Sequence, residues 1–195
     1  KVVVVGGGNV AMDAARTANR LGAKEVHIFY RRSKEEMPAN PWDIREAEEE
    51  GVKFQFLVAP KRILGKSGRV TSLECVRMEL GELDESGRRR PIPVEGSEFI
   101  VELNTLILAL GENPNLSFLP KKVEITKENT IAVDPFTMET TKEGVFAGGD
   151  VVSGPASVAE AIVAGKRAAE SIDHYIKSKI RTGRRIKQVV EVANK

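Results

Sequence analysis

The residues best suited to chemistry are glycines that follow a run of valines at the start of the chain. Residues 2–5 are all valine, and Gly6, Gly8 and Ala11 match the pattern G-x-G-x-x-G/A. In this pattern two glycines allow a tight turn and the close approach of a pyrophosphate, and a small third residue lets a helix pack on the strand. Because the N-terminus of that helix has unpaired N–H groups, it can bind phosphates. The pattern therefore predicts a dinucleotide site, with a tight strand-to-helix turn that binds nothing as the alternative.

Two arginines follow the next apolar run. Residues 26–30, VHIFY, have the composition of a second strand, and Arg31 and Arg32 come directly after them. A domain that binds NAD usually carries Asp or Glu here, on the ribose 2′-hydroxyl, whereas the planar fork of arginine pairs with a phosphate. The sequence therefore favours NADP(H) over NAD(H). The alternative is that Arg31, Arg32 and Lys34 are solvated loop residues.

A second glycine-rich block runs from residue 144 to residue 169. An apolar strand is expected before Gly149 and Asp150, and an alanine-rich helix follows a Gly-Pro turn. Asp150 can accept hydrogen bonds from a polyhydroxyl chain, and the N–H groups near residues 156–158 can face an electron-rich heterocycle. Asp150 is equally suited to capping its own turn, and the residues alone leave both roles open.

The elements that must position these residues follow from periodicity and turn signals. A helix is predicted over residues 41–50, with Asn40 as its N-cap. Strands are predicted over residues 52–58 and 70–80, the second with period two and one buried face. Residues 81–98 are polar and rich in Gly and Pro, which predicts an exposed hairpin loop. Residues 106–110 are apolar without alternation, which is typical of the buried centre of a parallel sheet.

Composition limits the remaining possibilities. The 30 basic and 28 acidic residues give a net charge of +2, which offers no general argument for nucleic-acid or membrane binding. Cys75 is the only cysteine, so the chain forms no internal disulfide and supplies no iron–sulfur ligand set. We expect no metal site, no membrane span and a cytoplasmic location. Because Lys1 directly precedes the first core strand, we also expect the sequence to be a piece of something longer.

Five motifs occur together in one order, namely GGGNVAMD, YRRSKEEMPA, AEEEGV, LALGENPN and VFAGGDVVSGPASVAEAI. Over residues 1 to about 175 the chain resembles the small-subunit-type flavoprotein of glutamate synthase. The pattern is also similar to the large subunits of ferredoxin:NADP oxidoreductases and sulfide dehydrogenases. Each motif alone is moderately specific, and their common order makes the resemblance strong.

The resemblance implies an α/β flavoprotein with two dinucleotide-binding domains. Residues 1–112 would be a Rossmann-like NADP(H)-binding domain with a parallel sheet and an antiparallel meander. Residues 113–175 would be the C-terminal half of the FAD-binding domain, and residues 176–195 a basic tail. The implied cofactor-binding residues are Gly6, Gly8, Asn9, Val10 and Ala11 for the pyrophosphate, Arg31 and Arg32 for the 2′-phosphate, Asp150 for the ribityl chain, Ala156, Ser157 and Val158 for the isoalloxazine ring, with Gly111 and Gly149 beside them.

The implied activity is hydride transfer between NADP(H) and FAD for onward electron transfer, with no catalytic side chain, because the chemistry belongs to the cofactors. The N-terminal FAD half and the iron–sulfur region of the family are absent, so the FAD site would be partial and those regions, with an electron-transfer subunit, would be partners. Two other hypotheses stay open. One is a non-catalytic NADP-binding module that acts as a sensor or scaffold. The other is binding of nucleic acid or an acidic partner through the tail, which carries seven basic residues and one acidic residue.

Overall fold

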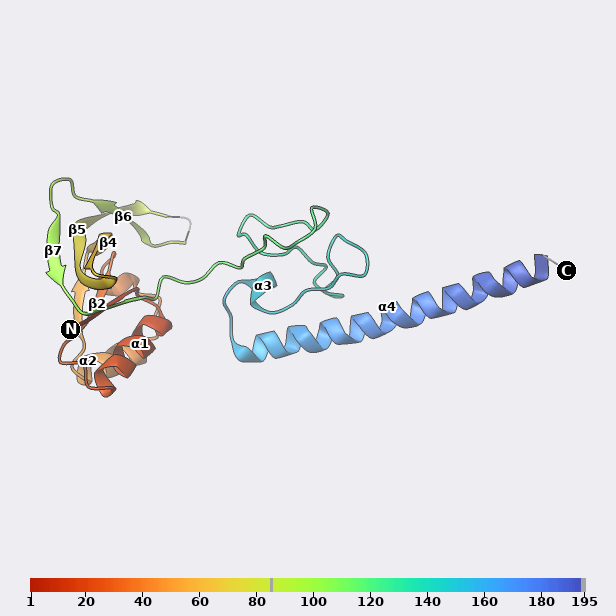
Figure 1. The fold of residues 1–195 in the computed structure, drawn as a ribbon, viewed down its shortest axis with the longest axis horizontal. Coiled ribbons are helices and arrows are strands. Elements are labelled where there is room, and N and C mark those ends of the chain that lie inside the picture. The colour runs from red at the N-terminus through yellow and green to blue at the C-terminus, as the bar shows by residue number, and fades with distance from the viewer. Residues whose placement is uncertain (85, 194–195) are drawn as a thin grey trace. The chain divides into compact units, whose positions relative to one another are not determined.

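The structure is a computed structural model of the chain, and it describes residues 1–84 and 86–193, with side chains described as far as residue 180. The contacts divide the chain into two compact units, Lys1–Leu110 and Gly111–Lys195 (Figure 1). The division falls close to the expected domain boundary after residue 112. The assignment of the two parts to two cofactors stays a prediction.

The first unit contains a parallel sheet that carries the glycine turn. Its four described strands have the order β3-β2-β1-β8 and span Lys53–Phe56, Val26–Tyr30, Val2–Val5 and Thr105–Leu108. Val2 on β1 pairs with both Val26 and Thr105, so β1 lies between its neighbours and all carboxyl ends point to the same edge. Two helices follow the first two strands, α1 over Asn9–Arg20 and α2 over Pro41–Glu49.

A second, antiparallel sheet completes the first unit. Strands β4, β5 and β6 are ordered as in the sequence, and β7 pairs with β5; they span Val58–Lys66, Arg69–Leu83, Arg89–Pro93 and Phe99–Glu102. The turn between β4 and β5 has positive φ at Ser67 (51°) and Gly68 (74°), which suits a tight two-residue hairpin. The parallel sheet and the antiparallel meander expected for this part of the chain are therefore confirmed.

The alternation of β1 builds both cores of the unit. Val4 packs with Ala11 and Met12 on the side of the helices, whereas Val3 and Val5 pack with residues of the antiparallel sheet. Figure 1 accordingly shows α1 and α2 on one side of the parallel sheet and β4–β7 on the other. Because both faces are covered, all of β2 is buried and the backbone at its end is held firmly.

Three expectations about the strands are corrected. The strand predicted over residues 52–58 is broken at Leu57, whose φ is 57°, so that β3 ends in one sheet and β4 begins in the other. The hairpin loop predicted over residues 81–98 contains β6, because β5 is long enough to pair with it. β8 lies at the end of the strand order instead of the centre, and Leu108 is 56% exposed.

The prediction of one buried face for residues 70–80 is also incomplete. Val76 and Met78 are buried on one face of β5, as the alternation indicates. Leu73 and Cys75, on the opposite face, are fully buried against the parallel sheet. The strand is thus covered on both faces over this short stretch, because β5 is the strand on which the antiparallel sheet packs against the rest of the unit.

The second unit consists of a looped segment and two helices (Figure 1). α3 spans Asp150–Ser153 and α4 spans Val158–Ala193. The apolar strand expected before Gly149 forms only an isolated bridge between Glu139 and Phe146 in the described residues, because no neighbouring strand continues the pairing. The side chains of residues 181–195, which carry most of the basic tail, lie outside the described residues.

Candidate functional site

The glycine turn lies where β1 ends and α1 begins. Gly6 has a φ of 150°, and its N–H donates to the carbonyl oxygen of Phe29 at 3.0 Å. A Cβ atom on Gly6 would lie 2.2 Å from the carbonyl oxygen of Ala109, the residue after β8. The first glycine of the pattern is therefore required by the close approach of two backbones, whether or not a ligand is bound.

Gly8 has a different environment. It is the N-cap of α1 with extended backbone (φ −93°), and a Cβ atom placed on it would meet no described atom within 4 Å. Asn9 and Val10 are exposed beside it, and as the first residues of the helix they have N–H groups without partners inside it. Ala11 is fully buried against the sheet, as its place in the pattern predicts. Gly8 thus leaves open space in front of a helix N-terminus, which fits a pyrophosphate.

The glycine turn is joined to the loop that follows β2. A Cβ atom on Gly7 would lie 2.4 Å from Cε2 of Tyr30, so the Tyr30 ring packs directly on the turn, and its hydroxyl donates to the carbonyl oxygen of Glu36 at 2.8 Å. The N–H of Ala39 donates to the carbonyl oxygen of Gly7 at 3.1 Å, and the N–H of Asn40 donates to Oδ1 of Asn9 at 2.8 Å. The two loops that would bind a dinucleotide therefore form one structure.

Sequence reasoning assigned Asn40 to the N-cap of α2, and its side chain does accept from the N–H of Trp42 at 3.0 Å. It missed the bond from Asn40 to Asn9 and the role of Tyr30 under the glycine turn. The only signal for the latter is that Gly7 is a third glycine that the G-x-G-x-x-A pattern does not need.

The two arginines after β2 have opposite environments. Arg31 is exposed, whereas Arg32 is 4% exposed. Nη2 of Arg32 lies 2.5 Å from Oδ2 of Asp84, and its Nε donates to the carbonyl oxygen of Arg89 at 2.7 Å. Asp84 is held in turn by hydrogen bonds from Ser86 and from the backbone N–H of Arg88, and these bonds together with the charge of Arg32 lower the pKa of Asp84 to about 2. The prediction that both arginines bind a 2′-phosphate stays a prediction, and Arg31 is the one with its side chain exposed.

Acidic residues in the loop after Arg32 are turned toward the backbone. Ser33 begins the short 3₁₀ helix Lys34–Glu36, and its N–H donates to the carboxylate of Glu36 at 3.1 Å. The hydroxyl of Ser33 donates to Glu35, which lowers the pKa of the Glu35 carboxyl. These carboxylates cap the loop, so the end of β2 presents a positive group in Arg31.

In the second unit, the residues predicted to face FAD lie near the start of two helices. Gly149 has a φ of 76° and precedes α3, whose first residue is the exposed Asp150. No described residue donates a hydrogen bond to the Asp150 carboxylate, so the capping role left open by the sequence is not the one observed. Ala156, Ser157 and Val158 are exposed, and Gly111, with a φ of 87°, is exposed at the start of this unit.

Ser157 caps α4 reciprocally with Glu160. The N–H of Ser157 donates to Glu160 at 2.9 Å, its hydroxyl donates to the same carboxylate at 2.7 Å, and the N–H of Glu160 donates back to the hydroxyl at 3.3 Å. This capping box uses one of the N–H groups that were expected to face a flavin. The N–H of Val158, at the first position of the helix, has no partner inside it.

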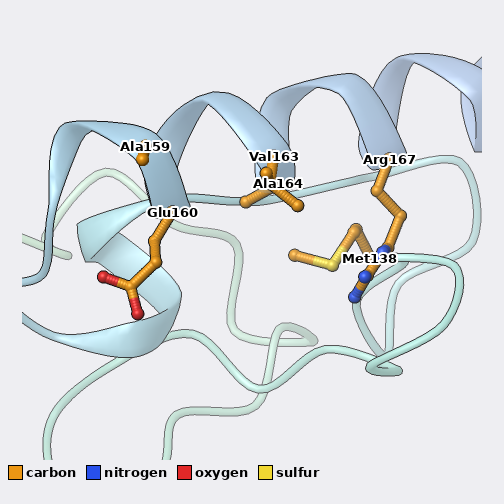
Figure 2. A pocket seen from close by; sticks show the side chains of 6 residues that line it. All are labelled: Met138, Ala159, Glu160, Val163, Ala164 and Arg167. Carbon is orange, nitrogen blue, oxygen red and sulfur yellow. The ribbon is translucent and has the colours of Figure 1, made fainter.

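A pocket of about 280 Å³ lies beside the first turns of α4. Figure 2 shows Met138 facing Val163 and Ala164, with the side chain of Arg167 reaching across the same space. Nη1 of Arg167 donates to the carbonyl oxygen of Pro135 at 3.0 Å, which joins α4 to the looped segment. The pocket is mainly apolar, and the carboxylate of Glu160, which also lines it, accepts the hydrogen bonds from Ser157 described above.

Other kinds of site find little support in the described part of the chain. Cys75 is fully buried, and burial raises the pKa of its thiol to about 11, so it is neither a thiolate nor accessible. Within residues 1–84 and 86–193 no group of His, Cys, Asp and Glu side chains is arranged to hold a metal ion. The same residues contain no helix of the length and apolarity needed to cross a membrane.

The chain is similar to subunits of known oxidoreductases. The chain is 53% identical over 176 residues to the NADP(+)-dependent formate dehydrogenase subunit beta of Moorella thermoacetica, covering 90% of this chain and 25% of that protein. It is 43% identical over 181 residues to the glutamate synthase [NADPH] small chain of Azospirillum brasilense, covering 91% of this chain and 37% of that protein. The chain therefore spans well under half the length of these relatives, and its resemblance to the glutamate synthase flavoprotein is confirmed.

Solved structures give the same fold. Thioredoxin reductase from T. acidophilum matches with a TM-score of 0.71 and 26% identity, covering 91% of this chain and 52% of that chain. The family model described as pyridine nucleotide-disulphide oxidoreductase matches residues 1–165. The chain belongs to the pyridine nucleotide-disulphide oxidoreductase family.

Proposed function

We propose that this chain is the NADP(H)-binding part of an FAD-dependent oxidoreductase and that it presents NADPH for hydride transfer to the flavin. The observation that carries the proposal is the open space at Gly8, in front of the N-terminus of α1 and joined through the Tyr30 contacts to the end of β2. At that end the chain has Arg31 and Arg32 in place of a carboxylate, which favours a cofactor with a 2′-phosphate.

The roles within this site follow from the described contacts. Gly8 admits the pyrophosphate, and the N–H groups of Asn9 and Val10 donate to it. The side chain of Asn9 also binds the loop after β2 and so fixes the distance between the pyrophosphate and ribose positions. Arg31 and Arg32 set the preference for NADP(H). No side chain acts as an acid or a base, since bound FAD supplies the hydride chemistry.

The second unit would contribute only part of the FAD site. Asp150 has an unpartnered carboxylate suited to ribityl hydroxyls, and Val158 begins the long helix α4 with a free N–H. Several apolar side chains of this unit are exposed, with Val158 at 78%, Ile162 at 53% and Phe118 at 76%. Exposure of this extent suits a surface that another part of the protein covers. We propose that an N-terminal FAD half and an iron–sulfur region, both implied by the family resemblance, complete the site, and that an electron-transfer subunit in the cytoplasm accepts or supplies the electrons.

The first experiment is parallel calorimetric titration of the 195-residue chain with NADPH and NADH, after its visible spectrum has been recorded for bound flavin. We expect tighter binding of NADPH and little or no copurified FAD. Arg31→Ala should weaken NADPH binding by at least tenfold and spare NADH, because a charge-assisted contact to phosphate contributes about 1.5–3 kcal/mol. Arg90→Ala removes the same charge from an exposed position on β6 and serves as the control. Equal binding of both nucleotides, or no binding of either, would contradict the proposal.

A further inference from the structure

The two neighbouring arginines at the end of β2 are used differently by the fold. Arg32 is enclosed between the parallel sheet and the hairpin of β5 and β6, with its side chain 5% exposed. Its backbone is also held, because its carbonyl oxygen accepts from the N–H of Leu57 at 3.2 Å. Arg31 precedes it directly and is exposed. A side chain anchored in this way has little freedom to turn toward a ligand.

The residue that anchors Arg32 is itself built into a turn. The N–H of Asp84 donates to the carbonyl oxygen of Arg88 at 2.7 Å, which closes the hairpin. Oδ1 of Asp84 accepts from the N–H of Ser86 at 2.9 Å, from its hydroxyl at 2.5 Å and from the N–H of Arg88 at 3.3 Å. Oδ2 is thereby left to face Nη2 of Arg32. The carboxylate is oriented by its own turn before it meets the arginine.

The arrangement reaches the cofactor site through Arg31. The side chain of Arg32 is bonded to Asp84 and Arg89, in the hairpin of β5 and β6, and its backbone is bonded to Leu57, between β3 and β4, so the chain just after β2 is fixed from two directions. The next residue back along the chain is Arg31, whose position follows from that of Arg32. We propose that Asp84 and Arg32 form a latch that positions Arg31, and that Asp84, which touches no part of the cofactor, is a positioning residue for the selection of NADP(H) over NAD(H).

This inference rests on the proposed function and divides the work of the two arginines. Arg31 contacts the 2′-phosphate, and the charge of Arg32 is neutralised within the protein by Asp84. The competing view, in which Arg32 binds the phosphate directly, makes the opposite prediction for a variant of Asp84. Removing that carboxylate would free Arg32 and also remove a negative charge near the phosphate, and both effects would tighten NADPH binding.

The test is the dissociation constant of the 195-residue chain for NADPH and for NADH in Asp84→Asn. The amide oxygen of this variant retains an acceptor for Ser86 and Arg88, whereas its NH₂ group faces Arg32 and cannot accept from it. We expect NADPH binding to weaken by about 2- to 30-fold, the range for substitutions that act on a site without touching its ligand, and NADH binding to change little. Glu82→Gln removes the same charge from an exposed position on the same hairpin and should change neither constant.

A second comparison separates positioning from a general effect on stability. In an Arg31→Ala background, Asp84→Asn should cause no further loss of NADPH binding, because the latch acts through Arg31. If Asp84→Asn melts at a much lower temperature, Ser86→Ala, which removes only one donor to Asp84, replaces it and should shift NADPH binding in the same direction by less. Tighter NADPH binding in Asp84→Asn, or an unchanged ratio of the two constants, overturns the latch. If the unmodified chain does not prefer NADPH over NADH, and neither Arg31→Ala nor Asp84→Asn changes NADPH binding, the proposed function is overturned instead.

Discussion

The two glycines of the pattern should fail in different ways when each is replaced by alanine. Gly6→Ala places a Cβ atom 2.2 Å from the carbonyl oxygen of Ala109, which is backbone and has little room to move, and it does so at a φ of 150°. Overpacking costs about 1–3 kcal/mol and an unfavourable φ costs about 1–3 kcal/mol, so the unit should lose about 2–6 kcal/mol. For a unit of this size that corresponds to a fall in melting temperature of roughly 8–24 °C.

Gly8→Ala should leave the fold almost unchanged. Its backbone is extended, and the new Cβ atom would meet no described atom within 4 Å. Alanine lowers the entropy of the unfolded chain but is a poorer N-cap than glycine, and these effects of about 1 kcal/mol each have opposite signs. The same Cβ atom occupies the space proposed for the pyrophosphate, where overpacking of about 1–3 kcal/mol would weaken binding by roughly 5- to 150-fold.

The assay is thermal unfolding of both variants together with titration by NADPH and NADH. Gly8→Ala should weaken both nucleotides alike, because they share the pyrophosphate, and this distinguishes it from Arg31→Ala, which acts on NADPH alone. The reasoning is refuted if Gly8→Ala binds NADPH as the unmodified chain does. It is equally refuted if Gly6→Ala melts at the unmodified temperature, since the 2.2 Å approach would then not constrain the turn.

Two further predictions concern titration and reactivity. Hydrogen bonds from Arg20 and Arg16 lower the pKa of Glu50 from 4.5 to about 2, so this group stabilises the fold above about pH 4.5 and its contribution is lost as the pH falls toward 2. Glu50→Gln should therefore reduce the loss of unfolding free energy between these pH values, measured by chemical denaturation. An unchanged pH dependence would show that the ion pairs joining α1 and α2 contribute nothing. The thiol of Cys75 is buried and its pKa is raised to about 11, so it should not react with a chromogenic disulfide reagent at pH 8 until the protein is unfolded in guanidinium. Full labelling of the native protein within minutes would contradict its burial.

The glycine turn could be predicted because its signal is local. Gly6, Gly8 and Ala11 are within six positions of each other, and the valines before them have the composition of a strand, so the strand, turn and helix follow from one short segment. The N-cap at Asn40 is local in the same sense, since its side chain bonds two residues ahead. Local sequence patterns of this kind predict structure without knowledge of the tertiary contacts made by the rest of the chain.

The strand predictions were wrong at positions where tertiary contacts determine where a strand ends and what covers it. Leu57 has a φ of 57° without being glycine or asparagine, so no residue type marks the point at which the chain leaves one sheet for the other. The apolar run over residues 106–110 indicates burial on both sides, yet Leu110 is 64% exposed and β8 ends the strand order of the described sheet. An apolar run indicates that a strand can be buried on both faces, but it does not say which other part of a protein buries it.

The difference between the two arginines could not be read from their type. Arg31 and Arg32 are adjacent and chemically identical, and both lie in the bend that follows β2. Which of the two is buried depends on Asp84, which is 52 residues away from Arg32 in the sequence. The sequence indicates that a positive charge is available at the end of β2. The fold determines which of the two charges is neutralised.

The two cofactor regions differ in how much of each is built by this chain. The pyrophosphate turn is supported from within its own unit, by the packing of Tyr30 on Gly7, by the bond from Ala39 to Gly7, and by the bond from Asn40 to Asn9. Asp150, in contrast, is exposed, and no described residue donates to its carboxylate. A site whose parts are held in place before the ligand arrives loses less entropy on binding. We therefore expect this chain by itself to bind NADP(H) and to retain little FAD, and separate measurements of the two cofactors test this difference.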